Sequence, residues 1–297
     1  MSNKPRKMTL EKKHNLTGWA FLAPETFLIA VFSFWPMIKA LVLSFQTGKG
    51  RNMQMAGFTN YIRLFQDDVF IQSIKNTFFY FILQVPIMLV VAMVLACILN
   101  KKDLRFKGFF RTMIFLPCTT SLVAYSIIFR SLFANDGLVN YVLVNLGILD
   151  KPYNFLTQPF AAKMVIILAL LWRWTGYNMV FFLSGLQNIE YSVYEAAKID
   201  GASAIQTFFK ITVPLLKPTI LLTAIMSTNG TLQLFDESIN LTDGGPANAS
   251  ISMSHYIYNL CFKYVPNFGY AAAMSFFILL LVAVLAFIQM RVGDKRD

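Results

Sequence analysis

Residues 78–99, FFYFILQVPIMLVVAMVLACIL, form an uncharged run that is almost entirely apolar. Crossing the hydrocarbon core of a bilayer, about 30 Å thick, takes about 20 residues of helix at a rise of about 1.5 Å each. Inside lipid every backbone N–H and C=O group needs an internal partner, so a run of this kind must be helical. The stretch therefore predicts a membrane-spanning helix.

Similar apolar runs recur along the whole chain. Of its 297 residues, 56% are hydrophobic and only 14% are charged, which is more apolar surface than a soluble core of this size needs. The expected fold class is all-α, a polytopic membrane protein with six transmembrane helices. Pro36, Pro86 and Pro117 are expected to kink three of these helices. The predicted spans cover residues 19–45, 74–99, 109–133, 161–186, 217–241 and 268–290.

The distribution of positive charge predicts the orientation. Sixteen Lys and Arg side chains fall in segments on the same side as the N-terminus, and seven fall in segments on the other side. Cytoplasmic loops collect Lys and Arg, so the basic N-terminus (1–18) and the tail (291–297) are both expected in the cytoplasm, with the chain in the plasma or inner membrane. The first apolar run is too long for the core of a signal peptide, which favours an uncleaved span.

Composition argues against several other classes. The cytoplasmic loops account for the net charge of +11 without nucleic-acid binding. Cys97, Cys118 and Cys261 form no disulfide framework and no metal-ligand spacing, and the chain has only two histidines. It has no P-loop for ATP. No metal, no cofactor and no catalytic residue is therefore expected.

Residues 194–219, YEAAKIDGASAIQTFFKITVPLLKPT, form a half-polar segment between two apolar spans. It lies in a predicted cytoplasmic loop, 187–216. Two short helices separated by Gly201 would present apolar and charged side chains together, and Pro214 and Pro218 would end the element. Such a segment suits docking on a soluble partner, and it equally suits lying on the lipid headgroups.

The spacing in this segment resembles the EAA motif in permeases of binding-protein-dependent ABC importers, with a Val in place of the usual Leu. The matching residues are Glu195, Ala196, Ala197, Gly201, Ile211, Val213 and Pro214. Three further stretches resemble the carbohydrate branch of that family, the maltose type. They are GFTNYIRLFQDDVFIQSIKNT (57–77), LTDGGPANAS (241–250) and NFGYAAAMSFF (267–277). The resemblance covers nearly the whole chain.

The resemblance implies a permease subunit that forms half of the translocation channel of an ATP-driven importer of carbohydrates, oligosaccharides in particular. Its ABC type-1 transmembrane domain would cover residues 74–290. The implied partners are a second homologous permease, a cytoplasmic ATPase dimer, the sugar, membrane lipid, and an extracytoplasmic sugar-binding protein docked on outer loops that include 243–267. The residues implied to contact the ATPase are Glu195, Ala196, Ala197 and Gly201.

Two other classes fit a polytopic chain. A secondary transporter would work without an ATPase, but the sequence shows no internal repeat and no strong coupling-ion site. A membrane-embedded transferase would need clustered carboxylates or a His-based metal site, and the sequence offers neither.

Several polar side chains fall inside predicted spans, where they are costly and indicate function by default. Arg173 is expected near the middle of the membrane, either in an ion pair with Asp236 or Glu237 or facing a wet cavity. Intervals of four, three and four residues would place another polar set on one face of the fifth span. This set is Asn229, Gln233, Asp236 and Asn240.

The family resemblance points to a different face of the fifth span for the sugar pathway. The implied positions are Trp172, Thr175, Gly176 and Met179 in the fourth span and Ser227, Gly230, Thr231 and Leu234 in the fifth. The glycines would leave room for a ligand, or would let two helices pack closely. Trp172, Trp174 and Tyr177 would stack on sugar rings or serve as ordinary interface aromatics. The Asn229 set would then face the second permease or brace the bundle.

Overall fold

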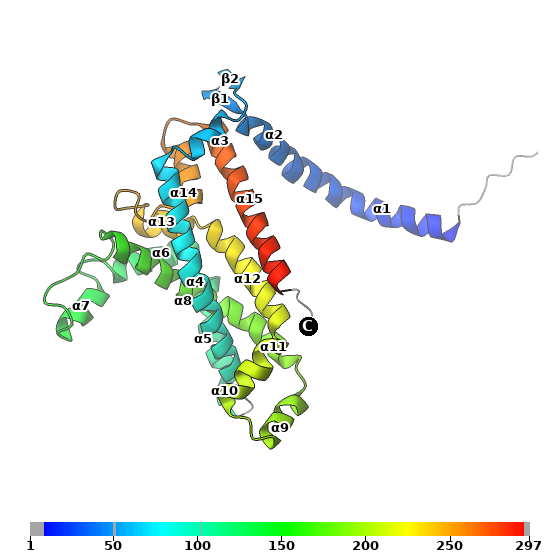
Figure 1. Cartoon of the computed structure of the whole chain (residues 1–297), viewed down its shortest axis with the longest axis vertical. Helices are drawn as coiled ribbons and strands as arrows, with labels where there is room; N and C mark the ends of the chain where they lie inside the picture. The colour runs from blue at the N-terminus through cyan, green and yellow to red at the C-terminus, as the bar shows by residue number, and fades with distance from the viewer. Residues whose placement is uncertain (1–8, 50–51, 102, 294–297) are drawn as a thin grey trace, which may run out of the picture.

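The computed structural model describes residues 9–49, 52–101 and 103–293, and it consists of a helical bundle with a long helical arm (Figure 1). The arm comprises α1 (Leu10–Ile29), a π-helical segment (Ala30–Phe34) and α2 (Trp35–Ser44). It projects away from the bundle, and none of its most apolar window is buried. The helix begins at Leu10 rather than at residue 19, because a spanning helix can continue past the bilayer surface.

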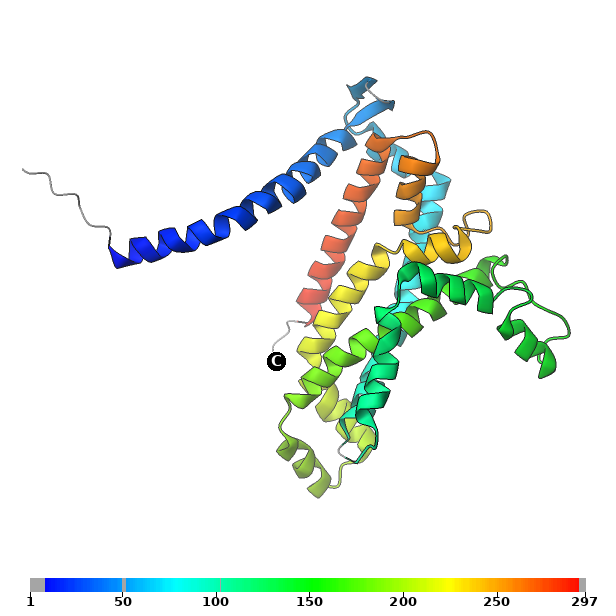
Figure 2. The ribbon, with the colours of Figure 1, turned by 180° about the vertical axis from the view of Figure 1, so that it is seen from behind.

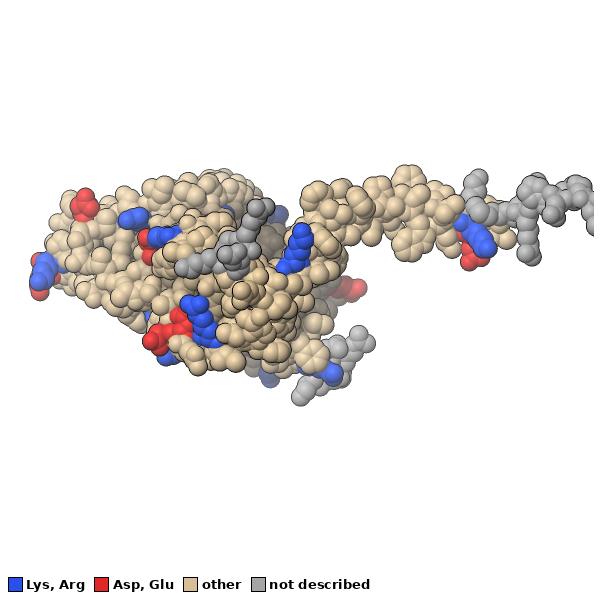
Figure 3. Space-filling model, turned by 90° about the horizontal axis from the view of Figure 1, so that it is seen from above, with Lys and Arg blue, Asp and Glu red and all other residues tan. Residues whose placement is uncertain are grey.

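The arm has the surface of a segment that faces lipid or another apolar surface. On the side shown in Figure 3 most of its middle carries no charge, and Glu25 is the one charged residue between Trp19 and Trp35. Trp19, Phe32 and Trp35 are exposed along it. Pro36 lies two residues after the π-helical segment, whose wider turn accommodates the missing backbone donor.

A β-hairpin and a short helix join the arm to the bundle. These are β1 (Gln46–Lys49), β2 (Asn52–Met55), which pairs antiparallel with β1, and α3 (Thr59–Leu64). The buried side chain of Asn60 donates hydrogen bonds of 2.8 Å to the backbone oxygens of Ser44 and Gln46. These bonds fix the end of the arm against α3.

The bundle is built from four long helices, and Figures 1 and 2 show it from two opposite sides. The helices are α4 (Asp68–Asn100), α8 (Pro159–Gln187), α12 (Lys217–Leu232) and α15 (Phe268–Gly293). The most extensive interface joins α4 to α8, and α12 packs against both α4 and α15. Tyr80 and Ile166 lie in one buried cluster of the α4–α8 interface, and Ala92 and Phe182 lie in another. The predicted spans 74–99, 161–186 and 268–290 fall inside α4, α8 and α15.

The third predicted span, 109–133, is not a single helix. Its residues form α5 (Lys107–Thr119) and α6 (Leu122–Leu132), and α7 (Leu138–Asn145) follows. α5 and α6 meet at 98°. Pro117 removes one donor from the last turn of α5. Thr120 and Ser121 then have non-helical backbone, with ψ of 151° and 137°, so the helical hydrogen-bond ladder stops after Thr119. The prediction of a kinked but continuous span was wrong, because this corner is nearly perpendicular.

The half-polar segment before the fifth span is ordered and helical. It forms α9 (Tyr191–Ile199), α10 (Ala204–Thr207), a π-helical segment (Phe208–Thr212) and α11 (Val213–Leu215). The helical stretch from Ala204 to Leu215 meets α12 at 71°. Figure 1 places α9 and α10 at the end of the bundle opposite the β-hairpin.

The fifth predicted span, 217–241, was also wrong as one helix. α12 ends at Leu232, and α13 (Asp236–Thr242) is a separate short helix. The hydroxyl of Ser252 donates a hydrogen bond of 2.5 Å to the backbone oxygen of Leu234 and so supplies a partner within the break. The polar set at 229, 233, 236 and 240 therefore does not share one helical face.

The chain continues through α14 (Met253–Tyr258) and a π-helical segment (Asn259–Lys263) into α15. Within the described ranges, four helices are long and apolar enough to cross a membrane: the arm (Leu10–Ser44), α4, α8 and α15. The count is six if α5 with α6, and the stretch Ala204–Leu215 with α12, are each taken as one bent span. The all-α class is confirmed, and six spans hold on that count.

Candidate functional site

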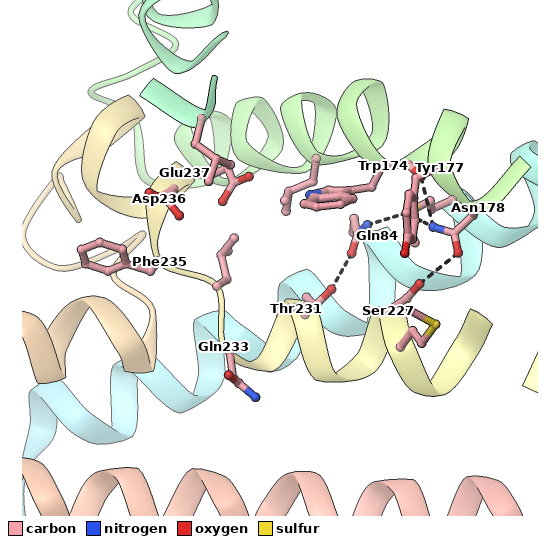
Figure 4. A pocket seen from close by; sticks show the side chains of 16 residues that line it. Gln84, Trp174, Tyr177, Asn178, Ser227, Thr231, Gln233, Phe235, Asp236 and Glu237 are labelled. Atoms are coloured by element: carbon pink, nitrogen blue, oxygen red, sulfur yellow. Dashed lines mark hydrogen bonds between the residues drawn. The ribbon is translucent and has the colours of Figure 1, made fainter. Parts of the chain in front are cut away.

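A cavity of about 300 Å³ opens among α4, α6, α8, α12 and the start of α13 (Figure 4). Its lining is apolar over most of its area, with polar groups at defined points. The polar and aromatic lining residues are Gln84, Trp174, Tyr177, Asn178, Ser227, Thr231, Gln233, Phe235, Asp236 and Glu237. A mostly apolar cavity with a few convergent polar groups is the usual form of a small-molecule site.

Side-chain hydrogen bonds across the helices hold the polar part of the lining in place. The hydroxyl of Thr231 donates to Oε1 of Gln84 at 2.8 Å, which joins α12 to α4. The hydroxyl of Ser227 donates to Oδ1 of Asn178 at 3.3 Å, which joins α12 to α8 (Figure 4). Buried polar networks with satisfied partners are rigid, so these groups face the cavity in fixed positions.

Two aromatic side chains from α8 complete one wall. Trp174 and Tyr177 lie edge to face with ring centroids 5.8 Å apart. Asn178 donates to the backbone oxygen of Trp174 at 3.0 Å. The wall therefore combines aromatic surface with amide groups.

Two carboxylates lie at another end of the cavity, at the start of α13. The hydroxyl of Tyr125 donates a hydrogen bond to Oε1 of Glu237, which is buried. Asp236 is half-buried, and within the described residues its carboxylate enters no ion pair and accepts no side-chain hydrogen bond. The two carboxylates thus differ: Glu237 accepts a hydrogen bond from a protein donor, whereas Asp236 can accept one from a ligand.

Arg173 does not form the predicted ion pair with Asp236 or Glu237. Its guanidinium donates instead to backbone oxygens at the corner between α5 and α6, with distances of 2.7 Å to Thr120 and 3.3 Å to Cys118. The carbonyls of the last helical turn lack partners and carry the negative end of the helix dipole, so a cation is stabilised there. The prediction missed this site because it rested on a continuous third span.

The guanidinium of Arg173 also lies between two aromatic rings. Its carbon is 4.9 Å from the ring centroid of Tyr125 and 5.3 Å from that of Trp174. Tyr125 donates a hydrogen bond to Glu237, and Trp174 lines the cavity. Arg173 therefore lies behind both the acidic end of the cavity and its aromatic wall.

The cavity includes some of the residues predicted for the pathway and leaves out others. All four residues predicted in the fifth span line it: Ser227, Gly230 and Thr231 on α12, and Leu234 in the break after that helix. None of the four predicted residues of α8 does, and the neighbouring Trp174, Tyr177 and Asn178 take that place. Met179 is fully buried in a helix interface, and Thr175 is also buried.

Gly176 and Trp172 contact other helices instead of the cavity. A Cβ added at Gly176 would lie 1.9 Å from the backbone oxygen of Ile114, so α5 and α8 approach each other at this glycine. The ring of Trp172 packs on Phe129, with centroids 5.5 Å apart. Close packing, which was one of the two interpretations of the glycine, is what its surroundings fit.

Gln84, Asn178 and Glu237 line the cavity but were not predicted to do so, and Tyr125 was not predicted as the donor to Glu237. Gln84 is the one carboxamide in the long apolar run of α4, and that isolation was a usable signal. Nothing local in the sequence marks Tyr125.

Asn229 and Gln233 lie together in a second groove between α12, α14 and α15, which has a volume of about 620 Å³. The amide of Gln233 donates to Oδ1 of Asn229 at 2.5 Å. Ser254 and Ser275 also line this groove. Gln233 borders both hollows, whereas Asn229 borders only the second.

The half-polar segment presents an ordered, exposed surface at the end of the bundle. Glu195 and Ala196 are exposed on α9, while Ala197 is buried and its backbone oxygen accepts from the N–H of Ala202 at 2.9 Å. Gly201 has a φ of +76°, a conformation that glycine adopts without strain. No atom lies near enough to meet an added Cβ there, so the glycine serves the turn between the helices.

A capping box starts the next helix. The hydroxyl of Ser203 accepts from the N–H of Gln206 at 3.2 Å, and Oε1 of Gln206 accepts from the N–H of Ser203 at 2.8 Å. Ile199 is 85% exposed beside this turn, and Ile205 and Phe209 are exposed after it. Exposed apolar side chains next to charged ones make this segment a candidate docking surface.

A bundle of membrane-spanning helices that surrounds a partly polar cavity and ends in such a surface defines a membrane transport subunit. The family described as "Binding-protein-dependent transport system inner membrane component" matches residues 68–296. The chain is 51% identical over 292 residues to the lactose transport system permease protein LacF of Rhizobium radiobacter, with 98% of each covered. The chain therefore belongs to the family of inner membrane components of binding-protein-dependent transport systems.

Solved structures share the fold. One belongs to a bacterial ABC transporter involved in the import of the acidic polysaccharide alginate, with a TM-score of 0.85, 24% identity, and 97% of this chain and 98% of that chain covered. Another holds the bacterial alginate ABC transporter in complex with an alginate pentasaccharide-bound periplasmic protein, with a TM-score of 0.85, 25% identity and 98% of each chain covered.

Proposed function

We propose that this chain is the permease subunit of an ATP-driven carbohydrate importer and forms half of its translocation channel. The observation that carries the proposal is the cavity, where Trp174 and Tyr177 offer aromatic surface beside the hydrogen-bonding groups of Gln84, Asn178 and Thr231. Sugars present C–H faces to aromatic rings and hydroxyl groups to amides. The similarity to a lactose permease supports the same class of substrate.

A cytoplasmic ABC ATPase dimer supplies the energy and contacts α9 and the turn after it. The exposed Glu195 and Ala196 and the apolar Ile199 are the contact surface. The capping box and the Ala202–Ala197 backbone bond make this segment stiff, so that it passes on displacement instead of absorbing it. Docking on a protein is favoured over lying on lipid, because the exposed apolar residues are interleaved with charged ones.

Both termini are cytoplasmic, as is the segment from α9 to α11, and the β-hairpin is extracytoplasmic. A second, homologous permease covers the arm of this chain. An extracytoplasmic sugar-binding protein docks on the side of the membrane where the β-hairpin lies, on loops that include 243–267. The alginate transporter solved with its periplasmic protein supports that arrangement.

Reconstitution in proteoliposomes tests the proposal. The assembly contains this chain, the second permease, the ATPase and the binding protein, with labelled lactose and neutral oligosaccharides as probes. Uptake is expected only with enclosed ATP and external binding protein. Uptake driven by an ion gradient without ATP would favour a secondary transporter, and recovery of a covalently altered sugar would favour a transferase.

Orientation has its own test. A Gln206→Cys variant, made after replacement of the native cysteines, is expected to react with an impermeant thiol reagent only in inverted membrane vesicles. Reaction in intact cells would overturn the orientation without touching the transport proposal.

A further inference from the structure

The cavity differs in charge from the chain that surrounds it. The chain has 26 Lys and Arg against 15 Asp and Glu, yet the cavity lining includes two carboxylates and no Lys, Arg or His. Arg173 stands behind Trp174, but its guanidinium donates to the backbone oxygens of the α5–α6 corner. A ligand in the cavity therefore meets carboxylates, amides, hydroxyls and aromatic rings.

Of the two carboxylates, that of Asp236 is the one free to act on a ligand. Glu237 is buried and accepts the hydrogen bond of Tyr125, whose ring also contacts the guanidinium of Arg173. Asp236 is half-buried beside it and has no such partner among the described residues. A free carboxylate accepts hydrogen bonds from sugar hydroxyls, and within a membrane-embedded cavity it repels a second anion strongly, since screening by water is reduced.

We propose that the cavity admits uncharged sugars, and that Asp236 excludes sugars carrying a carboxylate or a phosphate. The inference rests on the proposed function, because it takes the cavity as the sugar route. The fold itself does not set this selectivity, since the same fold belongs to an importer of the acidic polysaccharide alginate. Any selection by charge within the permease then comes from side chains in the cavity, and Asp236 is the one placed for it.

The test measures sugar binding to the assembled permease–ATPase complex without the binding protein, so that selection by that protein does not enter. The probes are a neutral disaccharide and its uronic counterpart, which differ by one carboxylate. The variants are Asp236→Asn, Asp236→Lys and a control, Asp150→Asn, which changes an exposed carboxylate in a loop away from the cavity.

The wild-type complex and Asp150→Asn are expected to bind the neutral sugar at least about tenfold more tightly than the uronic one. Asp236→Asn should bring the two affinities within about threefold by tightening the uronic sugar, and Asp236→Lys should reverse the preference. An unchanged ratio in both Asp236 variants, with normal elution in size exclusion, would overturn the inference. Binding of neither sugar by an intact wild-type complex would contradict the proposed function itself.

Discussion

The hydroxyl of Tyr125 on α6 donates a hydrogen bond to the carboxylate of Glu237 on α13, and 112 positions separate the two residues. Both side chains are buried. The bond ties the corner of the broken third span to the break that follows α12, so the two irregular parts of the bundle are held to each other.

Tyr125→Phe is expected to lower stability by about 1–3 kcal/mol, because it leaves a buried acceptor without its donor. The measurement is the thermal unfolding of the purified complex. Adding Glu237→Gln should recover part of the loss, since a neutral amide costs less to bury alone than a carboxylate. Equal stability of the wild type and Tyr125→Phe would show that the bond contributes nothing.

Arg173→Ala should destabilise the α5–α6 corner by about 1.5–3 kcal/mol for the loss of charge-assisted hydrogen bonds to the carbonyls. Arg173→Lys should recover part of this, because it keeps the charge but not the planar fork. Arg130→Ala, at an exposed position on α6, serves as the matched control. The melting temperature and the yield of assembled complex are the measurements, and a loss with Arg130→Ala as large as with Arg173→Ala would contradict the assignment.

Gly176→Val and Gly230→Val should fail in different ways. At Gly176 an added Cβ meets backbone of α5, so the yield of assembled complex should fall at least about threefold and uptake of every sugar should fall alike. At Gly230, which lines the cavity, an added Cβ meets nothing within 4 Å. That variant should assemble normally and lose uptake of larger sugars first. Selective loss from Gly176→Val with normal assembly would return this glycine to the pathway.

Gly201→Leu should abolish uptake while leaving membrane insertion intact. A φ of +76° costs a side-chain-bearing residue about 1–2 kcal/mol, and a bulky group would also change the exposed turn. Gly201→Asn is the matched control, because Asn tolerates this backbone region and should keep most of the activity. Sugar-stimulated ATPase activity and uptake are measured together, and normal values for Gly201→Leu would exclude a coupling role for the turn.

Stability should fall as pH decreases from about 6.5 because of His255 on α14. Burial lowers the pKa of this imidazole from 6.5 to about 4, the nearby Asp243 carboxylate opposes the shift, and Lys263 adds to it. Between pH 6.5 and pH 4 the imidazole is protonated in the unfolded chain but neutral in the folded chain. The free energy of unfolding therefore decreases as the pH falls. Melting temperatures between pH 7 and pH 5 should decline less in His255→Gln than in the wild type. Parallel curves would rule the residue out.

The apolar runs were enough to predict the all-α class and the location of α4, α8 and α15, because long uncharged runs have one stable form in lipid. A kink at Pro117 was predicted, but the near-perpendicular corner there and the break after α12 were not, because distant partners stabilise them. Arg173 supplies donors to the carbonyls around Thr120, and Ser252 supplies one to Leu234. No local pattern near Thr120 or Leu234 records these contacts.

The candidate site divides in the same way. On α12 the positions implied by the family resemblance, such as Ser227 and Thr231, do line the cavity. On α8 the implied positions include Gly176 and Met179, which contact neighbouring helices instead. The face that a helix turns toward a cavity depends on how its neighbours pack, and the sharp corner between α5 and α6 places α5 against Gly176.

The projecting arm has a consequence for sequence divergence. Residues 10–12 and 14–40 bury almost nothing against their own chain, so their side chains contribute little to the stability of the bundle. Substitutions in the arm need only keep its hydropathy and its fit to the surface that it contacts in the membrane. Substitutions in α4 and α8 must also fit a packed interior. Related chains should therefore drift fastest along the arm, and in step with changes on the surface that it meets.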